Sequence, residues 1–185
     1  DRGVPIVICG SNHSPIALVW PIDGHYEQGR RMQNQAEASR PLRKRLWKEL
    51  VRSKILAQSD ALKVAGKRSG ALRELARKVR SGAPENIEGT AARRYWLLMM
   101  GDNFRRDRSL EGANAMLNYG YMVLRAATAR SILAAGLHPS LSVHHESRGN
   151  ALRLADDLME PFRPYVDGTV KELIETCGDK LDKNA

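Results

Sequence analysis

The chain has 185 residues, of which 42% are hydrophobic and 28% are charged. This length suits one domain of ordinary size, the composition excludes an intrinsically disordered chain, and no apolar run reaches the roughly 18 residues that a membrane-spanning helix needs. Thirty Lys and Arg against 21 Asp and Glu give a net charge of +9, which favours an acidic partner such as a nucleic acid.

The charge is distributed unevenly along the chain. Residues 27–108 hold 21 Lys and Arg against 9 Asp and Glu, a net charge of +12, whereas the remainder holds 9 against 12, a net charge of −3. The first part is typical of a phosphate-binding surface. The second part gathers acids and histidines, which favours a metal centre beside that surface.

Two short β-branched runs open the chain, GVPIVIC from Gly3 to Cys9 and PIALVW from Pro15 to Trp20, and they predict two strands. Two strands are too few for a stable sheet. We therefore interpret residues 1–26 as the remnant and linker of an N-terminal β domain whose remainder lies upstream. The first residue is Asp1 rather than Met, which agrees with a fragment or a processed chain without a signal peptide.

From Glu27 the hydrophobic period becomes helical, so residues 27–185 are expected to form a mainly α, multi-helical domain. We expect helices behind Pro41 to about Leu62, from about Leu72 to Ser81, from Asn86 to about Met100, from Ala113 to Ala135, from Asn150 to Glu160, and from Val166 to Thr176. Cys9 and Cys177 match no metal or redox spacing, and we interpret them as reduced thiols of a cytoplasmic protein.

Acids and histidines cluster in the C-terminal half. His144 and His145 end a connector, and Asp156, Asp157 and Glu160 follow on one predicted helix, where spacings of three and four place both aspartates beside Glu160. Oxygen ligands suit Mg²⁺ or Mn²⁺, and one imidazole favours Mn²⁺. The alternative is that these residues are solvated caps and surface charges.

Glu88 begins another predicted helix and is followed by small residues, Gly89 and Ala91-Ala92. The lack of bulk would let a phosphodiester backbone approach the carboxylate. The alternative is an acid in a first helical turn that the helix dipole favours.

A polar line, formed by Asn114, Asn118, Tyr121 and Arg125, runs along the otherwise apolar helix expected from Ala113. Buried polar groups need partners, so this line is expected to face a site or the residues around one. It could equally be the solvent edge of a partly exposed helix. The aromatics Trp47, Tyr95, Trp96, Tyr119 and Phe162 could stack on bases, although at helical spacing aromatics more often belong to the core.

Three segments carry a family resemblance: ENIEGTAARRYW, NAMLNYGYMVLRAATARSILAAGLHPSLSVHH and NALRLADDLMEPFRPYVD. They closely resemble the CRISPR-associated integrase and endonuclease that captures new spacers, in the form found in type II systems. The resemblance runs from the first strand to the tail. It implies an N-terminal β domain, most of it missing here, followed by an α-helical catalytic domain.

By motif position, the resemblance implies that Glu88, His145 and Glu160 are catalytic residues that bind one divalent metal, Mg²⁺ or Mn²⁺. His144 is the competing histidine, and Asp157 and Asn118 are auxiliary residues. Ser142 stands where such sequences usually have glycine before the histidines.

The implied chemistry is attack by the 3′-hydroxyl of a captured DNA fragment on a phosphodiester of a CRISPR repeat. Attack by water at the same site would give nuclease activity. The implied partners are double-stranded DNA with 3′ overhangs or branched DNA, a second copy of the chain, and a small ferredoxin-like CRISPR-associated protein. Two alternatives stay open, a non-catalytic DNA-binding scaffold subunit and an RNA-processing nuclease, which contacts to the 2′-hydroxyl would distinguish.

The basic helices gain a role beside such a site, because phosphate contacts position DNA without reading its sequence. The candidate DNA-binding residues are Arg43, Lys44, Arg45, Lys48, Arg73, Arg77, Lys78, Arg93, Arg94 and Arg105. Any one of them could instead be a solubilising charge.

Overall fold

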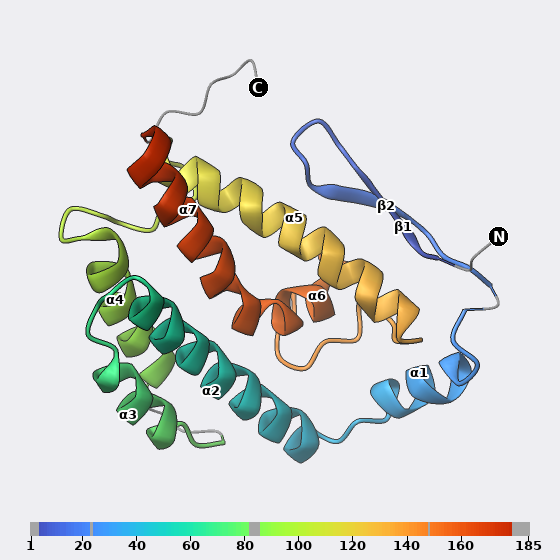
Figure 1. The fold of residues 1–185 in the computed structure, drawn as a ribbon. Helices are drawn as coiled ribbons and strands as arrows, with labels where there is room; N and C mark the ends of the chain where they lie inside the picture. Colours follow the sequence, from blue (N-terminus) through green and yellow to red (C-terminus); the bar gives the residue numbers. More distant parts are fainter. Residues whose placement is uncertain (1–3, 23, 82–85, 148, 179–185) are drawn as a thin grey trace. The chain divides into compact units, whose positions relative to one another are not determined.

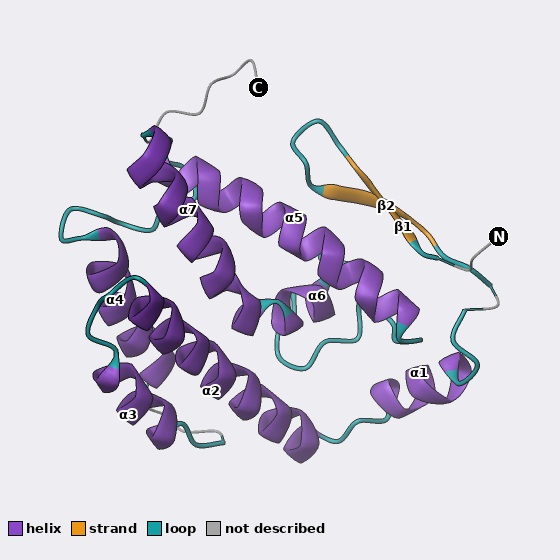
Figure 2. Ribbon diagram, viewed as in Figure 1, coloured by secondary structure: helices purple, strands orange, loops and turns teal. Residues whose placement is uncertain are grey.

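The computed structural model describes residues 4–22, 24–81, 86–147 and 149–178, and helices dominate it (Figures 1 and 2). The elements are β1 (Ile6–Cys9), β2 (Pro15–Val19), α1 (Gln28–Ala36), α2 (Arg40–Val64), α3 (Gly70–Lys78), α4 (Ile87–Met100), α5 (Ala113–Ala134), α6 (Arg153–Leu158), the 3₁₀ turn η1 (Glu160–Phe162) and α7 (Arg163–Cys177). The expected mainly α fold with a two-strand start is therefore confirmed. Among the described residues, no helix combines the length and the apolar character needed to cross a membrane.

The chain divides into two compact units, which are described one at a time. Unit 1 comprises Asp1–Trp47 and Met122–Glu160, and unit 2 comprises Lys48–Tyr121 and Pro161–Ala185. The division thus falls inside α2 and inside α5. A functional boundary between residues 26 and 27 stays a prediction.

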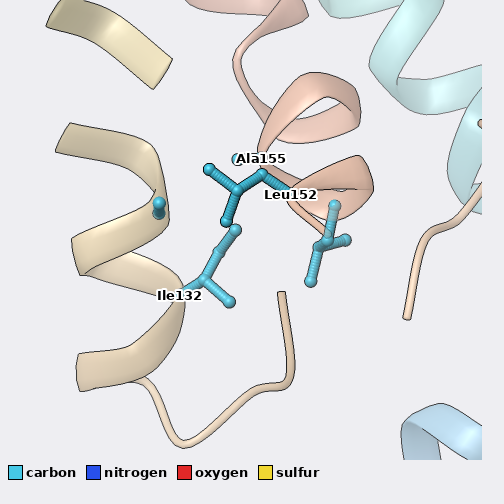
Figure 3. Packing of buried hydrophobic residues seen from close by; sticks show 5 residues of the cluster. Ile132, Leu152 and Ala155 are labelled. Carbon is cyan, nitrogen blue, oxygen red and sulfur yellow. The ribbon is translucent and has the colours of Figure 1, made fainter. Parts of the chain in front are cut away.

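In unit 1, β1 and β2 form an antiparallel hairpin in which Val7 pairs with Leu18. Both side chains pack against a buried apolar cluster, while Ile6 and Val19 on the other face are exposed. The cluster consists of Ala129, Ile132, Leu152, Leu154 and Ala155, part of which Figure 3 labels. The pairing of Val7 with Leu18 thus turns one face of the hairpin toward the cluster.

Helix α5 ends at a glycine that redirects the chain into the histidine-bearing connector. Gly136 has a φ of +69°, in the left-handed region that glycine adopts without strain. Its N–H donates to the carbonyl of Leu133 at 2.9 Å, and the N–H of Leu137 donates to that of Ile132 at 3.0 Å. These bonds satisfy carbonyls at the end of the helix, as in a Schellman motif.

The helix expected from Asn150 to Glu160 is shorter than predicted. Its helical part is α6, Arg153–Leu158, while Asn150 accepts the N–H of Leu152 at 2.9 Å in the turn before it. Pro161 has no N–H to continue the ladder, so the chain passes through η1, and α7 begins at Arg163 rather than at Val166. Glu160 therefore begins a 3₁₀ turn rather than lying on α6, and its expected place beside Asp156 and Asp157 stays a prediction.

In unit 2, α3 packs against α4, and buried residues on α2 include Val51, Ile55 and Leu62. Asn86 is the N-cap of helix α4, and its side-chain oxygen accepts the N–H of Gly89 at 2.7 Å. A Ser, Thr, Asp or Asn in this position satisfies an N–H that the first turn leaves without a helical partner. The cap fixes the first turn of α4, which carries Glu88.

Gly120 lets α7 pack closely against α5, because a Cβ added there would lie 2.4 Å from Cγ1 of Val166. We expect Gly120→Ala to lower the free energy of unfolding by about 1–3 kcal/mol, since overpacking forces side chains or backbone to move. Urea denaturation would measure the loss. The double variant Gly120→Ala with Val166→Ala should recover most of it, and a Gly120→Ala protein as stable as the wild type would contradict this close packing.

Candidate metal centre

A buried carboxylate organises the second half of the connector in unit 1. Asp157 is 0% exposed, and its Oδ2 accepts the N–H of Val143 at 2.6 Å and of His144 at 2.9 Å. Its Oδ1 lies 3.3 Å from the N–H of His145, which donates to it. Three consecutive backbone donors therefore converge on one side chain, which satisfies its lone pairs away from water.

The same carboxylate orients the ring of His145. The Nδ1 of His145 lies 2.6 Å from Oδ1 of Asp157, and the histidine side chain is 44% exposed. In the tautomer that carries its proton on Nδ1, the ring donates to Asp157 and Nε2 lies on the ring edge away from this bond. A carboxylate behind the imidazole is the arrangement that metal-binding histidines usually have. The His145–Asp157 pair therefore has the arrangement of a single metal ligand and the carboxylate that orients it.

His144, the competing histidine, has a different environment. Its ring stacks on the indole of Trp47, with centroids 4.2 Å apart and planes 9° from parallel. The two rings are thus held differently, that of His145 by a carboxylate and that of His144 by stacking.

The acids of α6 and η1 have separate surroundings. Asp156 accepts Nε of Arg125 at 2.7 Å, so it belongs to an ion pair with α5. Glu160 is 7% exposed at the start of η1, three residues after Asp157. A largely buried carboxylate on a turn is a chemically suitable oxygen ligand. No three acid, histidine or cysteine side chains within the described ranges gather into a preformed metal-binding group.

Glu88 lies in unit 2, in the first turn of α4, and is half-buried. The Nζ of Lys54, on α2, lies 2.8 Å from its Oε1. The carboxylate thus already has a cationic neighbour. Because the two residues are 34 positions apart, spacing along the chain did not predict this pair. The three predicted ligands are distributed over both units, with His145 and Glu160 in unit 1.

The polar line on α5 is largely buried and has partners, so it is not a solvent edge. Asn114 and Tyr121 are 5% and 8% exposed. Arg106 donates to Oδ1 of Asn114 at 2.8 Å and to Oδ1 of Asn118 at 2.7 Å. Asn118 therefore fixes an arginine of the preceding loop, while Arg125, in unit 1, holds Asp156 as described above.

A second buried carboxylate, Asp167 on α7, was not anticipated from the sequence. It accepts hydrogen bonds from the hydroxyls of Tyr95 on α4, at 2.8 Å, and of Tyr121 on α5. Burial raises the pKa of Asp167 to about 6, against the lowering effect of the two tyrosine hydrogen bonds. The guanidinium of Arg163 lies over the Tyr121 ring, 4.6 Å from its centroid.

The structure places the candidate DNA-binding residues mostly on exposed surface of α2, α3, α4 and the following loop. Lys48, Arg73 and Arg77 form ion pairs with Glu49, Asp60 and Glu74. Such exposed pairs are weak and compete poorly with phosphate. The exposed residues are Lys44, Arg45, Arg73, Arg77, Lys78, Arg93, Arg94 and Arg105, and Arg43 and Lys48 are half-buried.

A model of the family described as CRISPR associated protein Cas1 matches residues 1–180. The chain is 38% identical over 177 residues to the CRISPR-associated endonuclease Cas1 of Neisseria meningitidis, covering 95% of this chain and 58% of that protein. It is 29% identical to a CRISPR-associated endonuclease Cas1 of Pyrobaculum aerophilum, covering 94% of this chain and 63% of that one. The chain thus spans about three fifths of the length of these curated relatives.

Solved structures share the fold at lower identity. A Cas1 protein from Thermotoga maritima superposes with a TM-score of 0.76 at 21% identity, over 97% of this chain and 62% of that chain. A casposase bound to an integration product gives a TM-score of 0.72 at 24% identity, over 98% of this chain and 59% of that chain. A chain of a Cas6-RT-Cas1–Cas2 complex also gives 0.72, at 21% identity, over 97% of this chain and 22% of that one. The helical fold with its short leading hairpin is therefore that of Cas1 proteins.

Proposed function

Because the chain belongs to the Cas1 family of CRISPR-associated proteins, we propose that it carries the metal-dependent DNA endonuclease and integrase activity that inserts foreign DNA fragments as new spacers into a CRISPR array. The observation that carries this proposal is the pairing of His145 with buried Asp157, which leaves the Nε2 edge of an oriented imidazole for a metal. The names of the curated relatives, which are Cas1 endonucleases, support the same reaction class. The type II form stays a prediction from the resemblance.

We propose Glu88, His145 and Glu160 as the residues that would hold Mg²⁺ or Mn²⁺. Such an ion would supply Lewis-acid polarisation of a phosphoryl oxygen and stabilise charge on the oxygens in line. Asp157 binds the Nδ1 side of the His145 ring, so the Nε2 side is the one turned toward a metal in this proposal. The Nζ of Lys54, 2.8 Å from Oε1 of Glu88, orients this carboxylate through a charge-assisted hydrogen bond.

The substrate in this proposal is double-stranded DNA with 3′ overhangs or branched DNA, held through phosphates by the basic surface of α2, α3 and α4. The proposed partners are a second copy of the chain and a small ferredoxin-like CRISPR-associated protein. Support comes from the solved structures that share the fold, since one is a casposase bound to an integration product and another a Cas6-RT-Cas1–Cas2 complex. We keep a cytoplasmic location as part of the proposal.

Strand joining and cleavage of branched DNA in the presence of Mn²⁺ would test the function. We expect Glu88→Ala and His145→Ala each to lower both activities by about 100-fold or more, because several kcal/mol of charge stabilisation depend on the ligands. DNA binding in EDTA should change less than about twofold, since it depends on the basic surface. Glu172→Ala, which removes an exposed acid of α7, is the matched control and should keep full activity.

Two results would contradict the proposal. The first is a Glu88→Ala, His145→Ala double variant that still joins strands. The second is a wild-type protein that binds branched DNA but neither binds Mn²⁺ in calorimetry nor cleaves, which would favour the non-catalytic scaffold. Stronger cleavage of RNA than of DNA would favour the RNA-processing nuclease.

A further inference from the structure

A cluster of three aromatic rings in unit 1 covers the end of the histidine connector. Trp47, on the N-terminal part of α2, stacks on His144 with centroids 4.2 Å apart, and its ring meets that of His145 edge-on at 5.8 Å and 84°. The two imidazoles also meet edge-on, at 5.8 Å and 75°. Each ring therefore contacts both others in one of the two geometries that aromatic pairs favour.

The connector has two halves, and they are held by different side chains. In the first half, the amide of Gln35 on α1 bonds to backbone on both sides, accepting the N–H of His138 at 2.8 Å and donating to the carbonyl of Leu141 at 3.1 Å. Arg153 on α6 donates to the carbonyl of Ser140 at 2.7 Å. These bonds end at Leu141, before His144 and His145.

The second half rests on Asp157 and Trp47. Asp157 accepts hydrogen bonds from the N–H groups of residues 143 to 145 and also bonds to the ring of His145. The indole of Trp47 stacks on the ring of His144. The backbone bonds alone do not fix the rings of exposed side chains, which keep rotamer freedom on a surface loop. A parallel stack on a half-buried indole removes that freedom from His144. The edge contact of the indole with His145 adds to the bond between that ring and Asp157.

We propose that Trp47 is a positioning residue for His145, which holds the connector against Asp157 by stacking on His144. That His145 binds a metal rests on the proposed function, but the effect of Trp47 on the connector does not. The competing reading is that Trp47 stacks on a DNA base, the use considered for the aromatics from the sequence. The positioning role predicts a change in the connector and in Mn²⁺ affinity when Trp47 is replaced, whereas base stacking predicts a change in DNA binding.

Amide hydrogen exchange of the 185-residue chain, followed by NMR without metal, tests the positioning role directly. Trp47→Leu should speed exchange at Val143, His144 and His145 by about 3- to 10-fold, the scale of one aromatic pair. Trp47→Phe, which keeps a stacking ring, should stay within about twofold of the wild type on the same scale. Trp96→Leu, which removes another half-buried indole, is the matched control and should leave these three amides unchanged.

His144→Ala removes the other ring of the stack and keeps the test decisive if Trp47→Leu does not fold. It should speed the same amides, and the double variant should add little to either single one, because both changes remove one interaction. Unchanged exchange at all three amides in Trp47→Leu or His144→Ala would overturn the proposal.

Two binding measurements separate this inference from the proposed function. Calorimetry with Mn²⁺ should show affinity about tenfold weaker for Trp47→Leu and near normal for Trp47→Phe, as for other residues that orient a metal ligand. Binding of branched DNA in EDTA should not change. Weaker DNA binding with unchanged Mn²⁺ affinity would overturn the proposal in favour of base stacking. If the wild-type protein binds no Mn²⁺, the proposed function is contradicted. The amide exchange rates still test the role of Trp47 in that case.

Discussion

Replacing Asp157 by alanine is expected to lower the free energy of unfolding by about 3 kcal/mol, because it leaves several donors around a buried position without their acceptor. The carboxylate is 0% exposed and accepts three consecutive backbone N–H groups and the ring of His145. The stability of Asp157→Asn should lie between those of the wild type and Asp157→Ala. The asparagine keeps one accepting oxygen but places an NH₂ group against backbone donors. Urea denaturation, with the slope checked for constancy, would measure the differences.

The matched control for this variant is Asp60→Ala, which removes an aspartate from an exposed pair with Arg73. An exposed pair of this kind contributes at most about 1 kcal/mol, so the control should lie close to the wild type. Mn²⁺ binding should be lost in Asp157→Ala and retained in Asp60→Ala. An Asp157→Ala protein with wild-type stability would show that the three amides are satisfied by water, and the connector would then not depend on this carboxylate.

The elements of this fold were predictable where the hydrophobic period was long. Helix α5 was expected from Ala113 to Ala135 and ends at Ala134, and helix α4 was expected from Asn86 and begins one residue later. The failure came at α6, where periodicity could not show that only six residues are helical. Turn bonds around Asn150 and the missing N–H of Pro161 decided that region, and both act over a few residues.

For the candidate site, the sequence indicated the residue types but not their pairing. His145 and Asp157 were both singled out, yet the convergence of three backbone N–H groups on Asp157 depends on the folded connector. Lys54 and Trp47 reach Glu88 and His144 from α2, far away in sequence. Such long-range pairs leave no local pattern that spacing rules detect.

Asp167 is expected to make stability depend on pH in the opposite direction to a paired surface carboxylate. Burial raises its pKa from the ordinary 3.8 to about 6. Between these values the folded protein keeps a proton that the unfolded chain has released, so stability falls as the pH rises from about 4 to about 6. A pKa difference of about two units corresponds to roughly 3 kcal/mol.

The test compares the wild type with Asp167→Asn, which cannot ionise. Urea denaturation at pH 4 and pH 7 should show that the wild type loses about 3 kcal/mol relative to the variant over this range, because contributions of all other groups cancel in the difference. Parallel pH curves for the two proteins would contradict a raised pKa. Tyr95→Phe sharpens the test, since the hydroxyl of Tyr95 lowers the pKa of Asp167 through its hydrogen bond. Removal of this hydroxyl should raise the pKa of Asp167 further and extend the loss of stability above pH 6. This result would show that the tyrosine hydrogen bonds stabilise the charged form of Asp167 at neutral pH.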